Sequence, residues 1–502
     1  MNKPLLAAAA LLLLSSTAAH ALEGKALFDK IAADADAKVT YEAADEADGD
    51  TVTLTNLRIE GGDTNVTVGK LVLDGFRENG DVVELDASSS QNVVYEFPID
   101  AAARRKNPDG KASMKVSSGT SADFSGPAAV ILSMNLEGLS GRFKMGSYAL
   151  DGIEADFDGD GTFETTMSRV ALEGLDTPLE FRYTKEQLDA AEGPAPEPLK
   201  LDSLAIDGTR VATPTGELSL GDFKLDALVV PATVKAAPQE WSTLYRTASI
   251  GPVAFTTGGA KPYSFEKLSA TIEPAEGGVI RSKSVLEGMF VDLSAIGDAR
   301  LTGFANALGY SELKGRMTGD GVYDFASGEV SIDDVTIDLD DVAALSVAYK
   351  MTGYTPDFVT RMNELSLNAA ATAQDGKAAQ PDPAAMMKLL GELKLESAKV
   401  SLKDDSIVGR ALKFQAAQMK TSPEQLAAGA PMFVGMGMAQ LGAPEFTQQV
   451  SAAIGSFLQN PGTLTVSAVP AEPVPLLDVV GASQRAPKAV IDLLNVKVEA
   501  TQ

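Results

Sequence analysis

An eight-residue pattern of apolar positions recurs along the chain and predicts β-strands. In the segment VTLTNLRIEGGDTNVTVGKLVLDGF, from Val52 to Phe76, two copies each carry apolar residues at their first, third, sixth and eighth places. Side chains alternate along a strand, so two apolar residues spaced by two mark one of its faces. On a helix, at about 100° per residue, the same four positions would scatter around the circumference. Because a Gly-Gly step joins the copies, we predict an antiparallel hairpin.

The two apolar pairs of each copy are separated by two residues, which is one more than strict alternation along a strand allows. In the first copy the pairs are Val52 with Leu54, and Leu57 with Ile59. The extra residue is either a β-bulge that keeps both pairs on one face, or the point where the buried face of the strand switches. Both interpretations fit the pattern.

Near-copies of the pattern extend over much of the chain. Residues 199–208, LKLDSLAIDG, repeat VTLTNLRIEG place for place, and residues 218–226 repeat VTVGKLVLD. Their uneven spacing argues against a solenoid of fixed period. The prediction is therefore a mainly β protein with a long, antiparallel, repetitive and curved sheet that could form a groove. Further copies occupy residues 134–139, 143–150, 165–174, 263–270, 330–338 and 393–400.

The sequence of the last part of the chain predicts a C-terminal α-helical hairpin and a small α+β cap. The motif SPEQ at residues 422–425 fits a capping box with proline at the first helical position, which predicts a helix to about Gly442. A second helix is expected over residues 444–459. The methionine-rich stretch 432–438 is either buried in this hairpin against the sheet or contacts a lipid or a partner, because methionine adapts to irregular apolar surfaces.

The first 21 residues have the pattern of a secretory signal peptide. Lys3 precedes an apolar run from Leu5 to Leu14, and the small residues Ala19 and Ala21 frame a cleavage site. The run is shorter than the roughly 18 residues that a membrane helix needs. We expect an exported protein without a transmembrane helix, located in the periplasm or, alternatively, at the outer membrane or cell surface. The predicted parts are a signal peptide at 1–21, a first β-rich region at 22–192, a Pro-rich linker at 193–198, a second β-rich region at 199–410 and a C-terminal cap at 411–502.

Composition and charge exclude several kinds of site. His20 is the only histidine and the chain has no cysteine, so the cleaved chain would have neither residue. This excludes Ser-His-Asp and Cys-His nucleophilic sites, zinc sites built from these ligands, and disulfides. A formal net charge of -27 repels phosphate backbones and anionic headgroups, and the basic cluster at 104–106 is too small to compensate. Nucleic acid is therefore not an expected partner, whereas an apolar or lipid-like ligand is compatible with the composition.

The segment DFDGDG, which starts at Asp156, matches the opening of a calcium loop. Asp156, Asp158 and Asp160 could point their oxygens at one cation, and Glu164 could add a ligand. Met167 stands where such a loop has its bidentate glutamate. The alternative interpretation is an acidic hairpin turn that binds no metal.

No catalytic residue is predicted. Ser311 and Lys314 fit the S-x-x-K motif of penicillin-recognising enzymes, where a helix brings the lysine to the serine, but the S-D-N and K-T-G partner motifs are missing from the sequence. Carboxylate pairs at 333–334 and 340–341 could serve glycoside hydrolysis. One tryptophan and 6% aromatic residues leave little for the stacking of sugars.

The repeats and residues 309–353, GYSELKGRMTGDGVYDFASGEVSIDDVTIDLDDVAALSVAYKMTG, resemble the repetitive β-regions of AsmA-type and YdgA-type envelope proteins. The tail at 461–480, PGTLTVSAVPAEPVPLLDVV, is similar to that of uncharacterised exported proteobacterial proteins. AsmA-type proteins usually keep an N-terminal membrane helix, whereas this chain is expected to lose its apolar N-terminus. We expect an exported, non-catalytic envelope protein that binds an apolar or lipid-like ligand or acts as a scaffold. The alternatives are an outer-membrane or surface β-protein and, third, a carboxylate-dependent hydrolase.

Overall fold

The protein is mainly β over the residues that the computed structural model describes. These residues form 22 antiparallel strands, with most of the helices toward the C-terminus, which confirms the predicted fold class. They divide into two compact units, an N-terminal unit up to residue 260 and a C-terminal unit from residue 261 onward. The described residues are 24–35, 37–47, 51–61, 64–79, 82–99, 110–128, 141–157, 163–179, 197–230, 245–274, 278–296, 298–371 and 382–502.

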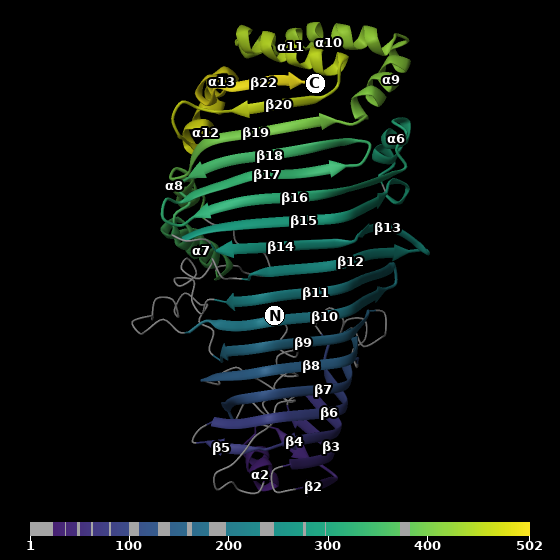
Figure 1. Cartoon of the computed structure of the whole chain (residues 1–502), viewed down its shortest axis with the longest axis vertical. Coiled ribbons are helices and arrows are strands. Elements are labelled where there is room, and N and C mark those ends of the chain that lie inside the picture. The colour runs from purple at the N-terminus through teal and green to yellow at the C-terminus, as the bar shows by residue number, and fades with distance from the viewer. Residues whose placement is uncertain are drawn as a thin grey trace. The chain divides into compact units, whose positions relative to one another are not determined.

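In the residues that the structure describes, the N-terminal unit contains one helix and a series of antiparallel strands (Figure 1). Its described elements are α2 (Gly24–Asp34), β1 (Lys38–Thr40), β2 (Ala43–Ala47), β3 (Thr51–Gly61), β4 (Thr64–Asp74), β5 (Arg77–Asn79), β6 (Val82–Pro98), β7 (Lys111–Pro127), β8 (Arg142–Asp156), β9 (Glu164–Pro178), β10 (Leu199–Thr213), β11 (Gly216–Val230) and β12 (Thr247–Thr257). From β3 to β12 each strand pairs with the next, except that β4 pairs with β6, as does the short β5. Both β1 and β2 pair with β3.

The C-terminal unit continues the same hairpin pattern and adds helices. Its strands are β13 (Ala260–Phe265), β14 (Lys267–Pro274), β15 (Val279–Asp292), β16 (Glu312–Asp324), β17 (Glu329–Leu339), β18 (Ala343–Thr352), β19 (Lys394–Asp404), β20 (Thr463–Ala468), β21 (Val474–Pro475) and β22 (Val496–Thr501). Its helices are η4 (Leu293–Ala295), α6 (Ala299–Ala307), α7 (Pro356–Ala371), α8 (Pro383–Leu390), α9 (Ile407–Met419), α10 (Pro423–Met438), η5 (Ala439–Leu441), α11 (Pro444–Gln459), α12 (Leu476–Arg485) and α13 (Pro487–Leu494). From β14 to β20 each strand pairs with the next, and β22 then pairs with β20.

The predicted helical hairpin is confirmed. Ser422 caps α10 and forms the capping box with Gln425, so the backbone N–H groups of the first turn are satisfied. Helix α11 spans the predicted residues 444–459 and packs against α10. The signal peptide and most of the linker, residues 193–196, lie outside the described residues. Strands β9 and β10, which flank the linker, are paired with each other.

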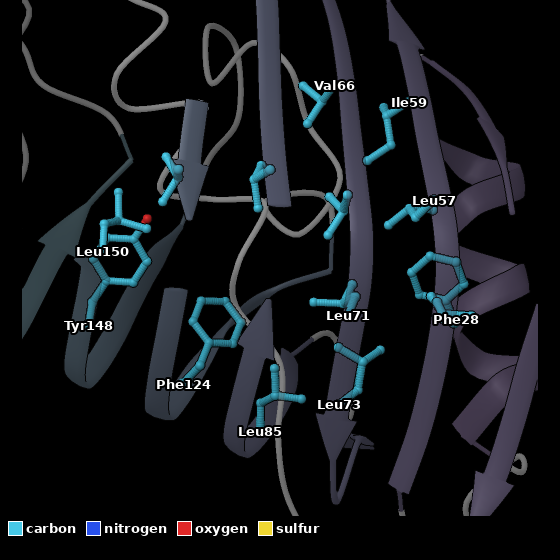
Figure 2. Close-up of a cluster of buried hydrophobic side chains, with 14 of the residues drawn as sticks. Phe28, Leu57, Ile59, Val66, Leu71, Leu73, Leu85, Phe124, Tyr148 and Leu150 are labelled. Carbon is cyan, nitrogen blue, oxygen red and sulfur yellow. The ribbon is translucent and has the colours of Figure 1, made fainter. Parts of the chain in front are cut away.

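The core of the N-terminal unit resolves how the repeated pattern folds. Val52, Leu54, Leu57 and Ile59 of β3 are each 0% exposed and belong to one hydrophobic cluster. Both apolar pairs of the pattern therefore lie on the same face, as the bulge interpretation requires. Figure 2 shows side chains from β3, β4, β6, β7 and β8 gathered on one side of the strands, with Phe28 of α2 among them.

The extra residue of each copy is matched by an extra residue in the neighbouring strand. Asn56 and Gly69 face each other between paired residues, and the register is the same on both sides of them. Asn56 has a φ of 52°, in the left-handed region that asparagine and glycine tolerate best. A β-bulge has its extra residue on one strand only, whereas here each strand contributes one, so the pairing continues unchanged on both sides and both strands bend at the same place.

These facing pairs line up in two rows across the N-terminal unit. Within each row, residues with positive φ occur on every second strand. The strands between them have their positive-φ residue in the other row. The first row consists of Asn56, Gly69, Asn92, Ser117, Gly152, Ser168, Gly208 and Gly221, with positive φ at Asn56, Asn92, Gly152 and Gly208. The second row consists of Gly75, Asp86, Asp123, Gly146, Gly174, Asp202 and Ala227, with positive φ at Gly75, Asp123, Gly174 and Ala227.

Candidate functional site

One face of the sheet in the C-terminal unit is apolar across its whole width. Residues that are directly opposite in neighbouring strands point to the same face, so the register identifies which side chains share it. We call this surface the apolar face. One line of it consists of Leu268, Leu286, Met317, Ile337, Leu345, Leu402, Leu464 and Ala500. A parallel line consists of Val335, Val347, Val400, Val466 and Val498.

The apolar face has side chains open to solvent from β14 to β20. Leu268, Ile337, Leu345, Val400 and Val466 are between 38% and 43% exposed. Single exposed apolar side chains are ordinary on protein surfaces, but a contiguous set is typical of a binding surface. Ile337 is the direct neighbour of Leu345, and Val400 that of Val466. The equivalent side chains of β3 in the N-terminal unit are completely buried.

Helices border the apolar face at both ends of its strands. At one end, Leu402 packs against a cluster that contains Leu308 and Tyr310 beside α6 and Phe414 of α9. At the other end, Phe358 of α7 and Leu389 of α8 form a second cluster. Figure 1 shows these helices at opposite ends of the strands.

The last strands of the apolar face are covered by the helical hairpin. Val450 and Ala453 of α11 form a cluster with Val498 of β22, and Leu464 and Ala500 pack against it. The hairpin therefore lies on the apolar side of the sheet, and the open part of the face extends from β14 to β20.

The opposite face of the same strands is polar. The hydroxyls of Thr336 and Ser346 lie 2.6 Å apart, and those of Ser401 and Thr465 lie 3.0 Å apart. Lys350 reaches Glu329 at 2.8 Å and Glu396 at 3.2 Å, and these side-chain hydrogen bonds raise the pKa of the lysine. A hydroxyl ladder with ion pairs suits contact with water. The two faces of the sheet therefore have different chemical roles.

The two apolar lines of this face carry no hydrogen-bonding side chains, although the register adds the hydroxyls of Ser284 and Tyr349 beside them. The strands from β15 to β19 are paired on both sides, so their backbone N–H and C=O groups are already engaged along most of each strand. The side chains of the two lines themselves present only carbon and, at Met317, sulfur. The surface can bind through burial of apolar area, which favours hydrocarbon over polar ligands.

The structure places only part of the predicted calcium loop. Asp156 ends β8 and is directly opposite Glu164, the first residue of β9. The ring of Phe157 lies next to those of Phe97 and Phe163, with centroids 6.5 and 6.2 Å apart. Asp158 and Asp160 lie outside the described residues. Within the described ranges, acidic residues nowhere gather in threes around a metal position.

The calcium loop stays a prediction with a direct test. If it binds, calorimetric titration of protein without residues 1–21 with calcium should show weak binding that disappears in Asp158→Ala, because the variant loses the central carboxylate. Magnesium serves as the control cation, since it demands a tighter octahedral geometry. Absence of heat at millimolar calcium would identify the segment as a hairpin turn.

The structure gives the other sequence motifs no catalytic arrangement. Ser311 immediately precedes β16 and Lys314 lies within it, so the helix that S-x-x-K requires is absent at these described residues. Lys314 instead donates to Glu312 at 2.6 Å. Asp333 and Asp334 are exposed on β17 and accept hydrogen bonds from hydroxyls of their own strand. The basic cluster at 104–106 lies outside the described residues.

Helix α10 presents an apolar surface that the sequence left undecided. Met432, Phe433 and Met436 are 61%, 53% and 64% exposed. Of the two alternatives for this stretch, burial is wrong for these three side chains, although Val434 and Met438 do pack into the hairpin. Spacing alone could not decide this, because apolar residues occupy most positions of the helix.

Comparison with known proteins gives a family match without a function. A family model described as "Uncharacterized protein" matches residues 336–501, which cover the chain from within β17 to the end of β22. No curated protein matches the chain. Among the helices that the structure describes, none has the length and apolar character needed to cross a membrane.

Proposed function

We propose that this chain is an exported, non-catalytic envelope protein that binds an aliphatic, lipid-like ligand on the apolar face. The carrying observation is the contiguous set of half-exposed side chains, such as Ile337, Leu345 and Val400, in the middle of a sheet whose other face is polar. Exposed apolar area of this kind is costly in water, and an apolar ligand would remove the cost.

A hydrocarbon chain fits this surface better than a peptide. A peptide lying on the apolar face would bury its own N–H and C=O groups, and the paired strands beneath it offer no partners for them. A hydrocarbon has no such groups. The five strand spacings from β14 to β19 span about 24 Å at about 4.8 Å each. This exceeds half of the roughly 30 Å core of a bilayer, which is the depth that one acyl chain occupies.

Three sequence features support the location within the cell envelope. Residues 1–21 have the pattern of a secretory signal, the strand repeats resemble those of AsmA-type and YdgA-type envelope proteins, and the acidic composition disfavours nucleic acid. We place the protein in the periplasm on these grounds.

Charge introduced on the apolar face tests the proposal. In titrations of the mature protein with a fluorescent fatty acid, Leu345→Asp is expected to weaken binding about tenfold or more, because the carboxylate would be desolvated against the ligand. The matched control is Ala344→Asp, which places the same charge one residue away on the polar face, opposite Lys403. Native mass spectrometry of gently prepared wild-type protein should show co-purifying lipid.

Two outcomes would count against this function. One is a wild-type protein that neither carries lipid nor binds the fatty acid. The other is equal binding by Leu345→Asp and Ala344→Asp, which would place the ligand away from the apolar face.

A further inference from the structure

Helix α10 carries a small apolar surface and has no charged residue after Glu424 in its first turn. We call Met432, Phe433 and Met436 the α10 patch; each is more than half exposed. From Gln425 to Pro444 the sequence has no lysine, arginine, aspartate or glutamate. A helix on the surface of so acidic a protein normally carries charged side chains. Both features together indicate a contact surface for something uncharged.

The α10 patch is held outward by the packing of the hairpin. Ala427 on the same helix is 3% exposed, and Val434 and Met438 pack into the cluster formed with α11. A Cβ added at Gly455 of α11 would lie 2.6 Å from Cγ of Pro431, so the two helices are already in close contact there. The helix therefore cannot rotate the α10 patch inward without breaking this interface.

We propose that the α10 patch inserts into the surface of a neutral or zwitterionic lipid bilayer. A helix lying in the interface buries a few apolar side chains among headgroups and acyl chains. Phenylalanine and the flexible methionines suit this irregular environment. The net charge of -27 disfavours anionic headgroups, and α10 has no basic residue to offset it.

The size of the α10 patch argues against a protein partner. At about 200 Å² for a large side chain, the observed exposures give the patch roughly 350 Å². A stable protein interface buries about 800 Å² on each partner. A bilayer needs no matching surface, so three inserted side chains can contribute to attachment.

Attachment through α10 would bring the apolar face close to lipid. Helix α11 packs on β20 and β22 from the apolar side, and α10 packs on α11. Both the α10 patch and the apolar face would then serve transfer of an acyl chain between a bilayer and the protein. This consequence rests on the proposed function, whereas the attachment itself does not.

Vesicle flotation tests the attachment directly. Protein without residues 1–21 is expected to float with phosphatidylcholine vesicles. Met436→Glu should lower the partition coefficient for these vesicles about tenfold or more, because burial of the apolar side chain is lost. The matched control is Met387→Glu on α8, where another methionine is 46% exposed, and it should float like the wild type. Circular dichroism confirms that both variants are folded. Vesicles with added phosphatidylglycerol should bind more weakly.

The outcomes separate attachment from ligand binding. Leu345→Asp should float normally even though it binds the fatty acid more weakly. The proposal is overturned if wild-type protein stays unbound, or if Met436→Glu and Met387→Glu float equally. It is also overturned if sedimentation shows a dimer that Met436→Glu abolishes, because the patch would then be a contact between two copies.

Discussion

Replacing Phe28 with alanine should lower the free energy of unfolding of the N-terminal unit by about 3–5 kcal/mol. The side chain is 0% exposed, lies on α2 and packs into the cluster formed by β3 to β8. Its ring also meets that of Tyr41 edge-on, with centroids 6.2 Å apart. Removing the ring leaves a cavity under a single short helix. Urea denaturation followed by circular dichroism measures the change.

Two control variants make this result specific. Phe28→Leu keeps most of the volume and should cost about 1.5 kcal/mol or less. Phe433→Ala removes an equal ring from an exposed position and should change stability by about 0.5 kcal/mol or less. A cost below about 1 kcal/mol for Phe28→Ala would show that α2 is not part of the cooperative core.

Opposite effects are expected at two positions of the second row in the N-terminal unit. Gly174 has a φ of 63°, and an added Cβ would lie 2.8 Å from Cβ of Asp202 and overlap its carboxylate. Gly174→Ala should therefore destabilise the unit by about 2–4 kcal/mol, since it combines left-handed strain with a clash against a fixed atom. The same urea experiment measures it.

The matched variant is Ala227→Gly, two strands away in the same row. Ala227 has a φ of 53°, a conformation that costs a residue with a Cβ about 1–2 kcal/mol. Glycine removes this conformational cost in the folded state. Part of the gain in stability is offset because glycine has more conformational entropy in the unfolded chain. We expect unchanged or higher stability, by up to about 1 kcal/mol. Destabilisation by both variants would mean that the row is not held by backbone conformation.

The repeated strand pattern predicted the elements well because it depends on local periodicity. Residues 52–59 and the copies that the structure describes became strands, and α11 ends at Gln459 as expected, whereas the copy at 134–139 lies outside the described residues. Positive φ at Asn56 and Asn92 agrees with the preference of asparagine for that conformation. Ala227 adopts it without any such signal, because the neighbouring strands of its row impose it.

The same pattern could not predict which of the apolar side chains are buried. Leu57 and Leu345 belong to similar apolar strands, yet the first is 0% and the second 41% exposed. What differs is the tertiary cover over each strand, and periodicity carries no information about it. The apolar face could therefore be recognised only from the register and exposure of the folded chain. For the same reason the sequence left burial and exposure of the α10 patch as two open alternatives.

The alternation of positive φ between the two rows limits how many strands can be inserted into the sheet of the N-terminal unit. Strands of the N-terminal unit come in two kinds, one bending at the first row and one at the second, and they alternate from β6 to β11. Insertion of a single strand would place two of the same kind side by side and misalign the bends. Insertion of a whole hairpin keeps the order. The repeating unit of this sheet is therefore a hairpin of two strands, one of each kind. Duplication of one hairpin at a time is the step by which such a protein could lengthen while keeping its curvature.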